Sequence, residues 1–383
     1  MRNYYEKFNL PYIVNAAGKW TIYGACRTFP KAAQAMVEAS QNYVELGTLL
    51  EKSGEYISGI LNVEAALVTA GASPALIQAT AACMVGMDPF SRSRLPSCPP
   101  SRCEVIIQRF HRNPYDNAVL TAGAKFIEIG NSMKTHPWEL EGVINNNTAA
   151  VVYAFCTVQP DSVLSLEETI AISHKHGVPV IVDAAPNLPP KSNLWTLAQQ
   201  GADLVVFSGG KDIRGPQTSG LIVGKKELVE AAAFNGAPNY GVGRPMKASK
   251  EIVAGLVAAL ECYLEENEEE RYACWNHIQQ EWISALDNCA GWKATPHQQG
   301  PSDLLPASVP RVDLTPPVGS KMSVTELVNR LKQGNPMILV DQNQTSVVLN
   351  PFPLEGDEWQ IITAKILEEL RKDSLLINNL PHI

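Results

Sequence analysis

The spacing of apolar and polar positions predicts a large α/β domain in the middle of the chain. Between about residues 60 and 227, short apolar runs alternate with segments of helical periodicity. Several runs are apolar on consecutive positions, which is typical of parallel strands in a sheet covered by helices on both faces. The predicted strands are Ala65–Thr69, Glu104–Gln108, Phe126–Ile129, Ala150–Ala154, Val178–Val182, Leu204–Phe207 and Leu221–Val223. The pattern therefore predicts a mostly parallel, seven-stranded sheet.

The predicted helices place the end of this domain near residue 264. Ser165–His176 opens with a capping-box pattern and is followed by Gly177. A long helix is predicted over Ala248–Leu264, and the acidic run Glu265–Glu270 after it is most simply a solvated helical face. The last third carries shorter helix and strand patterns over Trp275–Leu286, Val324–Lys332, Met337–Val340, Ser346–Leu349 and Glu358–Arg371. These patterns predict a small α+β domain.

The chain length supports this division, because 383 residues exceed what one hydrophobic core normally holds together. We expect an N-terminal segment over residues 1–60, a large domain over 61–264 and a small C-terminal domain over 265–383.

Composition and charge exclude several classes of partner. The net charge is −8 with no balancing basic region, which argues against nucleic-acid binding, although a local cluster of Arg and Lys could still bind an anionic substrate. The N-terminus does not resemble a signal peptide, and no apolar run approaches the roughly 20 residues that cross a bilayer. The eight cysteines are scattered without a C-x-x-C pair, as expected of free thiols in a reducing compartment. We expect a cytoplasmic protein without nucleic acid, membrane or metal partners.

A turn of small residues, Thr69-Ala70-Gly71-Ala72-Ser73, follows the first predicted strand and leads into the helix pattern PALIQATAACMVG. Small side chains let backbone N–H groups approach a phosphate, and the N-terminus of a helix adds a favourable dipole. The same residues are also common where a strand and a helix pack closely. A P-loop or dinucleotide-binding protein would explain this turn alone, but the residues match neither fingerprint.

Two ionisable residues follow later strands. Asp183 comes directly after Val178–Val182, at the strand end where open α/β sheets bind ligands, although it could instead be a turn or cap residue. Lys211 follows Ser208-Gly209-Gly210, where two glycines permit a sharp turn that projects the lysine into a site. Burial beside a cation would lower the pKa of Lys211 and favour its neutral, nucleophilic amine. Holding a phosphate is the competing role.

The order of phosphate turn, acid and lysine matches the fold-type I enzymes that use pyridoxal 5′-phosphate (PLP). In such a site Asp183 would keep the pyridine nitrogen protonated and Lys211 would carry PLP as a Schiff base. Four segments make the match more specific: IVNAAG (13–18), VDAAPNLPP (182–190), DLVVFSGGKDIRGPQTSGLIVG (203–224) and GVGRPMK (241–247). From about residue 10 to 260 the chain resembles the SelA-like PLP enzymes, relatives of bacterial selenocysteine synthase and of D-glucosaminate-6-phosphate ammonia-lyase.

The resemblance implies roles for individual residues. The implied catalytic residues are Lys211, Asp183 and His111, and the implied cofactor-binding residues are Gly71, Ala72, Ser73, His111, Asp183, Ser208 and Lys211. His111 would lie over the cofactor ring, with Phe110 as its rival for that place. Family dimers build each site from both chains, so we expect a homodimer or higher homo-oligomer, the segment 1–60 at its shared sites, and substrate contacts from Asn15, Arg214, Gln217, Arg244 and Lys247. Arg214 and Gln217 could equally brace the lysine turn, and Asp212 places an acid beside the amine.

The resemblance also implies a reaction on a small amino substrate. We expect an amino acid or amino sugar acid to react through a Cα carbanion, with β-elimination (an ammonia-lyase or dehydratase) ranked first. Racemisation or epimerisation comes second, Cβ replacement or aldol cleavage third, and transamination shares the same first steps. A tRNA substrate is discounted, because the chain is acidic and the resemblance leaves no room for an added tRNA-binding module. A PLP carrier without catalysis would keep Lys211 but not the RGPQ and GRPMK blocks.

Overall fold

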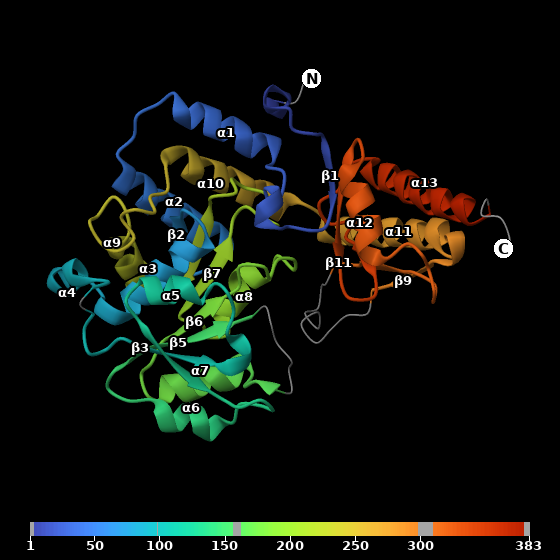
Figure 1. Cartoon of the computed structure of the whole chain (residues 1–383). Helices are drawn as coiled ribbons and strands as arrows, with labels where there is room; N and C mark the ends of the chain where they lie inside the picture. Colours follow the sequence, from blue (N-terminus) through green and yellow to red (C-terminus); the bar gives the residue numbers. More distant parts are fainter. Residues whose placement is uncertain (1–3, 98, 156–161, 298–308, 379–383) are drawn as a thin grey trace. The chain divides into compact units, whose positions relative to one another are not determined.

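The computed structural model describes residues 4–97, 99–155, 162–297 and 309–378. Within these ranges the chain forms two compact units (Figure 1). The large unit holds residues 26–266, and the small unit holds residues 4–25, 267–297 and 309–378. Both ends of the chain therefore contribute to the small unit, while the large unit is built from the stretch between them.

The large unit is built on a seven-stranded sheet in the order β2-β8-β7-β6-β5-β3-β4. Its strands are β2 (Ala65–Thr69), β3 (Glu104–Gln108), β4 (Lys125–Ile129), β5 (Thr148–Ala154), β6 (Val180–Asp183), β7 (Leu204–Ser208) and β8 (Gly220–Gly224). Strands β3 to β7 run parallel, and β8 is antiparallel to both β2 and β7. The seven predicted strands are confirmed, and the sheet is mixed because of β8.

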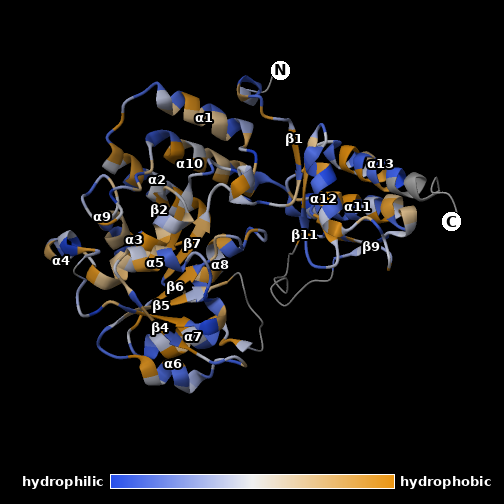
Figure 2. Cartoon of the chain, in the orientation of Figure 1, coloured by the Kyte–Doolittle hydropathy of each residue, from blue (hydrophilic) through white to orange (hydrophobic). Residues whose placement is uncertain are grey.

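The helices of the large unit lie around this sheet or pack on the helices that cover it, and its strands are hydrophobic along most of their length (Figure 2). They are α1 (Pro30–Ser40), α2 (Leu46–Leu61), α3 (Ala72–Val85), α4 (Pro89–Arg94), α5 (Asp116–Thr121), α6 (Pro137–Val143), α7 (Leu166–Lys175), α8 (Asn193–Gln199), α9 (Lys226–Asn235) and α10 (Lys250–Glu265). The capping box predicted for α7 is present, since Ser165 Oγ accepts from the backbone N–H of Glu168 at 3.1 Å. In α3 every residue from Ala75 to Val85 is buried, as expected of a helix that is apolar on all sides.

The small unit has a five-stranded sheet in the order β1-β11-β12-β10-β9. Its strands are β1 (Ile13–Ala16), β9 (Lys293–Pro296), β10 (Val312–Thr315), β11 (Met337–Gln342) and β12 (Val347–Leu349), and its helices are α11 (Glu268–Leu286), α12 (Val324–Gln333) and α13 (Glu358–Asn378). The sequence pattern did not predict β1, β9 or β10. Strand β1 pairs in parallel with β11, so the N-terminal residues complete a sheet formed largely by the end of the chain.

The acidic run Glu265–Glu270 does not lie on one helical face as expected. Helix α10 ends at Glu265, and Asn267 caps α11 by accepting from the backbone N–H groups of Glu269 and Glu270 at 3.1 and 3.3 Å. The last three acids therefore lie in the first turn of α11, where negative charge complements the helix dipole. None of the helices in the described part of the chain is both long and apolar enough to span a membrane.

Candidate functional site

The carboxyl ends of β2, β6 and β7, with the start of β8 between β2 and β7, bring predicted site residues to one edge of the large unit's sheet. Asp183 ends β6 and pairs with Val206 of β7, and Ser208 ends β7. Gly220, at the start of β8, pairs with both Ser208 and Thr69, the last residue of β2. Because β2, β6 and β7 point the same way, the segments that follow them emerge at one edge, which is where open α/β sheets bind ligands.

The turn after β2 has the backbone that an anion site needs. Gly71 adopts φ +123°, a conformation that side chains disfavour, and it precedes the first turn of α3 with Ala72 and Ser73. Thr69 Oγ1 donates to the Gly71 carbonyl oxygen at 3.0 Å and so holds the turn. The first N–H groups of a helix have no partner within the helix, so the start of α3 offers donors to a phosphate.

Gly220 supports this turn from the neighbouring strand, a role that the sequence analysis missed. A Cβ atom at Gly220 would lie 2.4 Å from the Gly71 carbonyl carbon and 2.7 Å from Thr69 Oγ1. Only a glycine therefore lets β8 pass so close to the turn. The signal for this role in the sequence is a glycine at the start of a strand. That signal can be interpreted only when the neighbouring strand is known.

Asp183 is a buried carboxylate coupled to Lys211. Its side chain is 6% exposed, and Oδ1 accepts from the backbone N–H of Ala185 at 3.1 Å. Burial raises the pKa of Asp183, while the Ala185 N–H and the charge of Lys211 lower it. The two predicted residues thus act on each other electrostatically within one site.

The lysine turn, residues 209–217, follows β7 and is shaped by its two glycines. A Cβ atom at Gly210 would lie 2.5 Å from the Gln217 Cα atom, and one at Gly209 would lie 2.2 Å from Ser219 Oγ. The turn can therefore fold back on itself only with glycine at both positions. Lys211 follows them and is half-buried.

Arg214 braces this turn, and Gln217 is exposed on it. Arg214 Nε donates to the Arg27 carbonyl oxygen at 3.1 Å, and its guanidinium carbon lies 4.3 Å from the centroid of the Phe29 ring. The Phe29 N–H in turn donates to the Arg214 carbonyl oxygen at 3.0 Å. Of the two roles expected for Arg214, these contacts favour bracing over substrate binding.

His111 lies in a short 3-10 helix (Arg109–His111) directly after β3 and is fully buried. Its ring centroid is 4.4 Å from that of Tyr153, in an edge-on arrangement. Neither ring nitrogen has a hydrogen-bond partner among the residues that the structure describes. Phe110, the rival for the place over the cofactor ring, is half-buried. A buried imidazole without partners is unusual and marks a place where another group is expected.

Burial lowers the pKa of His111 to about 4, so acid should destabilise the protein through this residue. The unfolded chain takes up the His111 proton as the pH falls through 6.5, whereas the folded protein resists it until about 4. When the pH falls from 8 to 5, the free energy of unfolding of the wild type should therefore decrease by about 2 kcal/mol more than that of His111→Phe. Urea unfolding of both proteins without added cofactor measures this difference. His277→Asn, at a side chain that is 63% exposed, is the control and should keep the wild-type pH dependence; the same dependence in His111→Phe would contradict the prediction.

The remaining predicted substrate residues come from other segments of the chain. Asn15 is on β1 of the small unit, where its Nδ2 donates to the Gly18 carbonyl oxygen at 3.0 Å and its Oδ1 accepts from the Ala17 N–H at 2.9 Å. Arg244 and Lys247 lie in the large unit on the loop after α9, with Arg244 half-buried and Lys247 exposed. The geometry of the large unit alone therefore does not bring Asn15 to the sheet edge.

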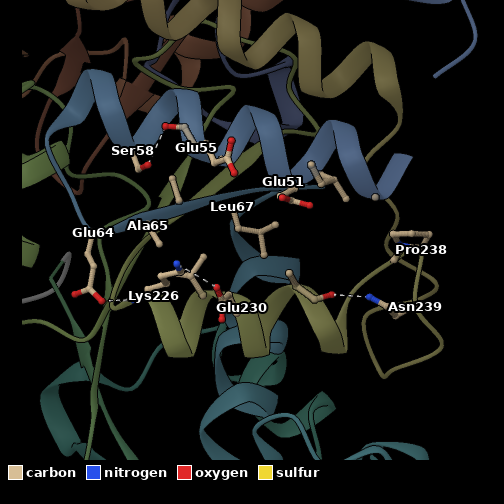
Figure 3. A pocket seen from close by; sticks show the side chains of 17 residues that line it. Glu51, Glu55, Ser58, Glu64, Ala65, Leu67, Lys226, Glu230, Pro238 and Asn239 are labelled. Atoms are coloured by element: carbon tan, nitrogen blue, oxygen red, sulfur yellow. Dashed lines mark hydrogen bonds and ion pairs between the residues drawn. The ribbon is translucent and has the colours of Figure 1, made fainter. Parts of the chain in front are cut away.

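A separate cavity of about 500 Å³ lies in the large unit between α2, β2 and α9 (Figure 3). Glu51, Glu55, Glu64 and Glu230 line it together with Lys226 and apolar residues such as Leu67. None of the predicted site residues is among the described residues that line it. The cavity is thus distinct from the sheet edge that holds Lys211.

Comparisons with known proteins identify the family. Residues 14–281 match the family model described as SelA: L-seryl-tRNA selenium transferase. A D-glucosaminate-6-phosphate ammonia lyase of Salmonella typhimurium is 33% identical over 268 residues, 68% of this chain and 70% of that protein. A 5′-C-glycyluridine monooxygenase-decarboxylase of a Streptomyces species is 30% identical over 381 residues, 96% of this chain and 92% of that protein.

A solved structure agrees with these matches. The structure of a D-glucosaminate-6-phosphate ammonia-lyase superposes with a TM-score of 0.84 at 28% identity, covering 98% of this chain and 100% of that chain. The resemblance inferred from the SGGK and GRPMK blocks is confirmed, and so is the fold class. The chain belongs to the SelA family, whose members are PLP-dependent enzymes of fold type I.

Proposed function

We propose that this protein binds PLP through Lys211 and acts on an amino acid or amino sugar acid, most simply by β-elimination. The observation that carries the proposal is the place of buried Asp183 at the end of β6, next to β7, which leads into the turn that carries Lys211. The Gly71 turn, backed by Gly220, and buried His111, which has no hydrogen-bond partner in the described ranges, follow other strands at the same edge.

The residues at this edge fit PLP. Gly71, Ala72, Ser73 and Ser208 would hold the phosphate, and the tight Gly71–Gly220 contact leaves no side chain in the way. Asp183 would hold the pyridine nitrogen, and its buried carboxylate suits a charged partner better than an apolar one. The ring of His111, whose nitrogens have no partner among the described residues, would face the cofactor ring. When bound, PLP acts as an electron sink for charge that develops at the substrate Cα atom.

Within this site Lys211 would move the proton. A neutral amine near the Cα atom can take the Cα proton as general base. Loss of a β-hydroxyl group then leaves an unsaturated product, which takes up water and gives a keto acid and ammonia. The similarity to an ammonia lyase over 68% of this chain supports elimination over the other fates of the Cα proton.

A specific observation supports a second candidate, oxidative decarboxylation. The relative named as a monooxygenase-decarboxylase matches 96% of this chain, whereas the ammonia lyase match covers 68% of it. Such a reaction would consume O₂ and release CO₂ instead of forming a keto acid with the same number of carbon atoms. Racemisation or epimerisation, Cβ replacement and aldol cleavage remain alternatives that need only a different fate for the Cα centre.

We further propose that the substrate is small and that the working enzyme is a homodimer or higher homo-oligomer with shared sites. Asn15, Arg244 and Lys247 would then meet the substrate, and Arg gives bidentate contacts to a carboxylate or phosphate. The bracing contacts of Arg214 make it the weakest of the proposed substrate residues.

A substrate panel in deuterated water tests the reaction. The PLP-loaded enzyme is incubated with β-hydroxy amino acids and amino sugar acids, and ammonia, keto acid, CO₂ and O₂ uptake are measured. We expect ammonia and keto acid in equal amounts, with deuterium from the solvent on the former Cβ atom and no O₂ uptake.

Each alternative reaction gives a different set of products in the same panel. Deuterium at Cα with inverted configuration and no ammonia would assign the enzyme as a racemase or epimerase. O₂ uptake matched by CO₂ release would assign it as an oxidative decarboxylase. The same panel with Lys211→Ala shows how much product forms without the enzyme's own amine.

A further inference from the structure

Helix α3 carries a glutamine in its buried middle. Gln78 is only 4% exposed and lies in the stretch of α3 that is buried throughout. Helix α9 packs against α3, and the loop after α9 lies against Gln78. We call residues 236–247 the Arg244 loop, because they include the proposed substrate residues Arg244 and Lys247. Burying a polar amide costs free energy, so a glutamine beneath this loop calls for an explanation.

Two glycines of the Arg244 loop lie directly on the Gln78 side chain. A Cβ atom at Gly236 would lie 2.9 Å from both Gln78 Cδ and Nε2 and 3.0 Å from Oε1. Distances this similar place the point over the flat face of the amide. A Cβ atom at Gly243 would lie 2.9 Å from Gln78 Cγ. The planar amide and the two glycines together let the loop backbone approach α3 closely.

The Arg244 loop is closed on itself above this contact. The Gly243 N–H donates to the Asn235 carbonyl oxygen at 2.9 Å, and Gly236 and Gly243 form a parallel bridge. The two glycines therefore move together, and Arg244 follows the second of them directly. The height of the loop above Gln78 thus sets the position from which the arginine side chain begins.

Arg244 is sensitive to such a change in height. Its side chain is half-buried with a buried Nε atom, and its guanidinium carbon lies 5.6 Å from the centroid of the Tyr240 ring. A guanidinium forms two parallel hydrogen bonds to a carboxylate or phosphate only in a narrow range of orientations. A displacement of about 1 Å can therefore cost on the order of 10²-fold in substrate turnover at limiting concentration.

We propose that Gln78 is a positioning residue for substrate binding, whose flat amide holds the Arg244 loop at the height that Arg244 requires. The inference rests on the proposed substrate contacts of Arg244 and Lys247. Methionine has a similar length but no flat face, so Gln78→Met should lift the loop from α3. Gly236→Ala should lift it from the other side, because the three atoms nearest the new methyl group all belong to Gln78.

The reactivity of Arg244 in the cofactor-free protein reports the height of the loop. Phenylglyoxal modifies arginine, and peptide mass gives the rate for Arg244 alone. Gln78→Met and Gly236→Ala should each raise this rate at least about twofold, because the buried Nε atom becomes exposed when the loop lifts. Gln34→Met and Gly142→Ala are the matched controls and should keep the wild-type rate. Gln34 is exposed on α1, and a Cβ atom at Gly142 would meet nothing within 4 Å.

A double-mutant cycle separates the contact with Gln78 from a general loss of packing. Gly236 has φ −98° and ψ 176°, an extended backbone that alanine adopts without strain. Its new methyl group should therefore be harmless once the amide is gone. Gly236→Ala should raise the Arg244 rate in the wild-type background and leave it unchanged in a Gln78→Ala background. The same rise in both backgrounds, or no rise in either, would overturn the proposal.

Turnover of the substrate identified by the panel above tests the consequence for binding. Gln78→Met should raise KM about tenfold and keep kcat within about twofold, because the loop binds substrate and does not move the proton. A variant that had only lost folded protein would instead show a lower kcat with the wild-type KM.

The two measurements fail independently. A changed Arg244 rate with an unchanged KM would refute the proposed substrate contacts of the loop, and with them the role of Gln78 in binding. A panel without turnover would refute the proposed reaction only, because the labelling needs neither substrate nor cofactor. If Gln78→Met does not fold, the cycle of Gly236→Ala with Gln78→Ala decides by itself.

Discussion

Replacing Lys211 with alanine is expected to abolish the covalent attachment of PLP and to lower turnover by about 10³- to 10⁴-fold. The amine is both the group that forms the Schiff base and the proposed general base, and losses of this size are typical when such a group is removed. Wild-type protein supplied with PLP should show a visible band, and borohydride should fix the cofactor on the peptide that contains Lys211. The variant should show neither.

Lys226→Ala is the matched control for this experiment. Lys226 belongs to the same unit, and its side chain is 66% exposed, with its nitrogen 3.9 Å from Glu230. It should keep the visible band, the borohydride-fixed peptide and full turnover. Cofactor that is still fixed by borohydride in Lys211→Ala would mean that another lysine carries it, and the central assignment would be wrong.

Replacing Gly220 with alanine is expected to destabilise the large unit by about 3 kcal/mol and to weaken PLP binding at least tenfold. An added methyl group normally costs about 1–3 kcal/mol in a well-packed interior, and here it would meet backbone atoms that cannot rotate away. The clash falls on the Gly71 carbonyl, 2.4 Å from the new atom, so the phosphate turn has to move. Urea unfolding and PLP titration measure the two effects separately.

Gly59→Ala is the matched control for the glycine experiment. Gly59 lies within α2, is exposed, and has no atom within 4 Å of its would-be Cβ position. Alanine there should raise the free energy of unfolding by about 0.5–1 kcal/mol, because glycine in a helix carries an entropic cost. A Gly220→Ala protein that matches the wild type in both measurements would contradict the prediction. It would show that β8 and the turn can move apart without loss of stability or of PLP affinity.

The large sheet could be predicted from the sequence because its strands are apolar on consecutive positions. Such runs show where a strand lies but not which way it points, so the antiparallel direction of β8 was not visible. The small unit was harder to predict for a different reason. The strand Lys293–Pro296 is short and mixes polar with apolar residues, and β1 is recognisable as a strand mainly through its partner β11.

The candidate site could be predicted as far as it follows strand ends. Asp183, Ser208 and the Gly71 turn come directly after apolar runs, and the structure places them at one sheet edge. The contacts of Asp212 and Arg214 could not be predicted, because they depend on how the lysine turn packs against Tyr263 and Phe29. These partners lie about 50 and 185 residues away along the chain.

The parallel pairing of β1 with β11 also decides when the small unit can form during synthesis. Val14 pairs with Ile338, so the first strand leaves the ribosome roughly 320 residues before its partner. The stretch that forms the large unit, residues 26–266, is made in between. Chains grow at about 5–20 residues per second and domains fold as units. The nascent chain therefore carries an unpaired β1 for tens of seconds while the large unit folds, and the small unit closes only after β11 has been made.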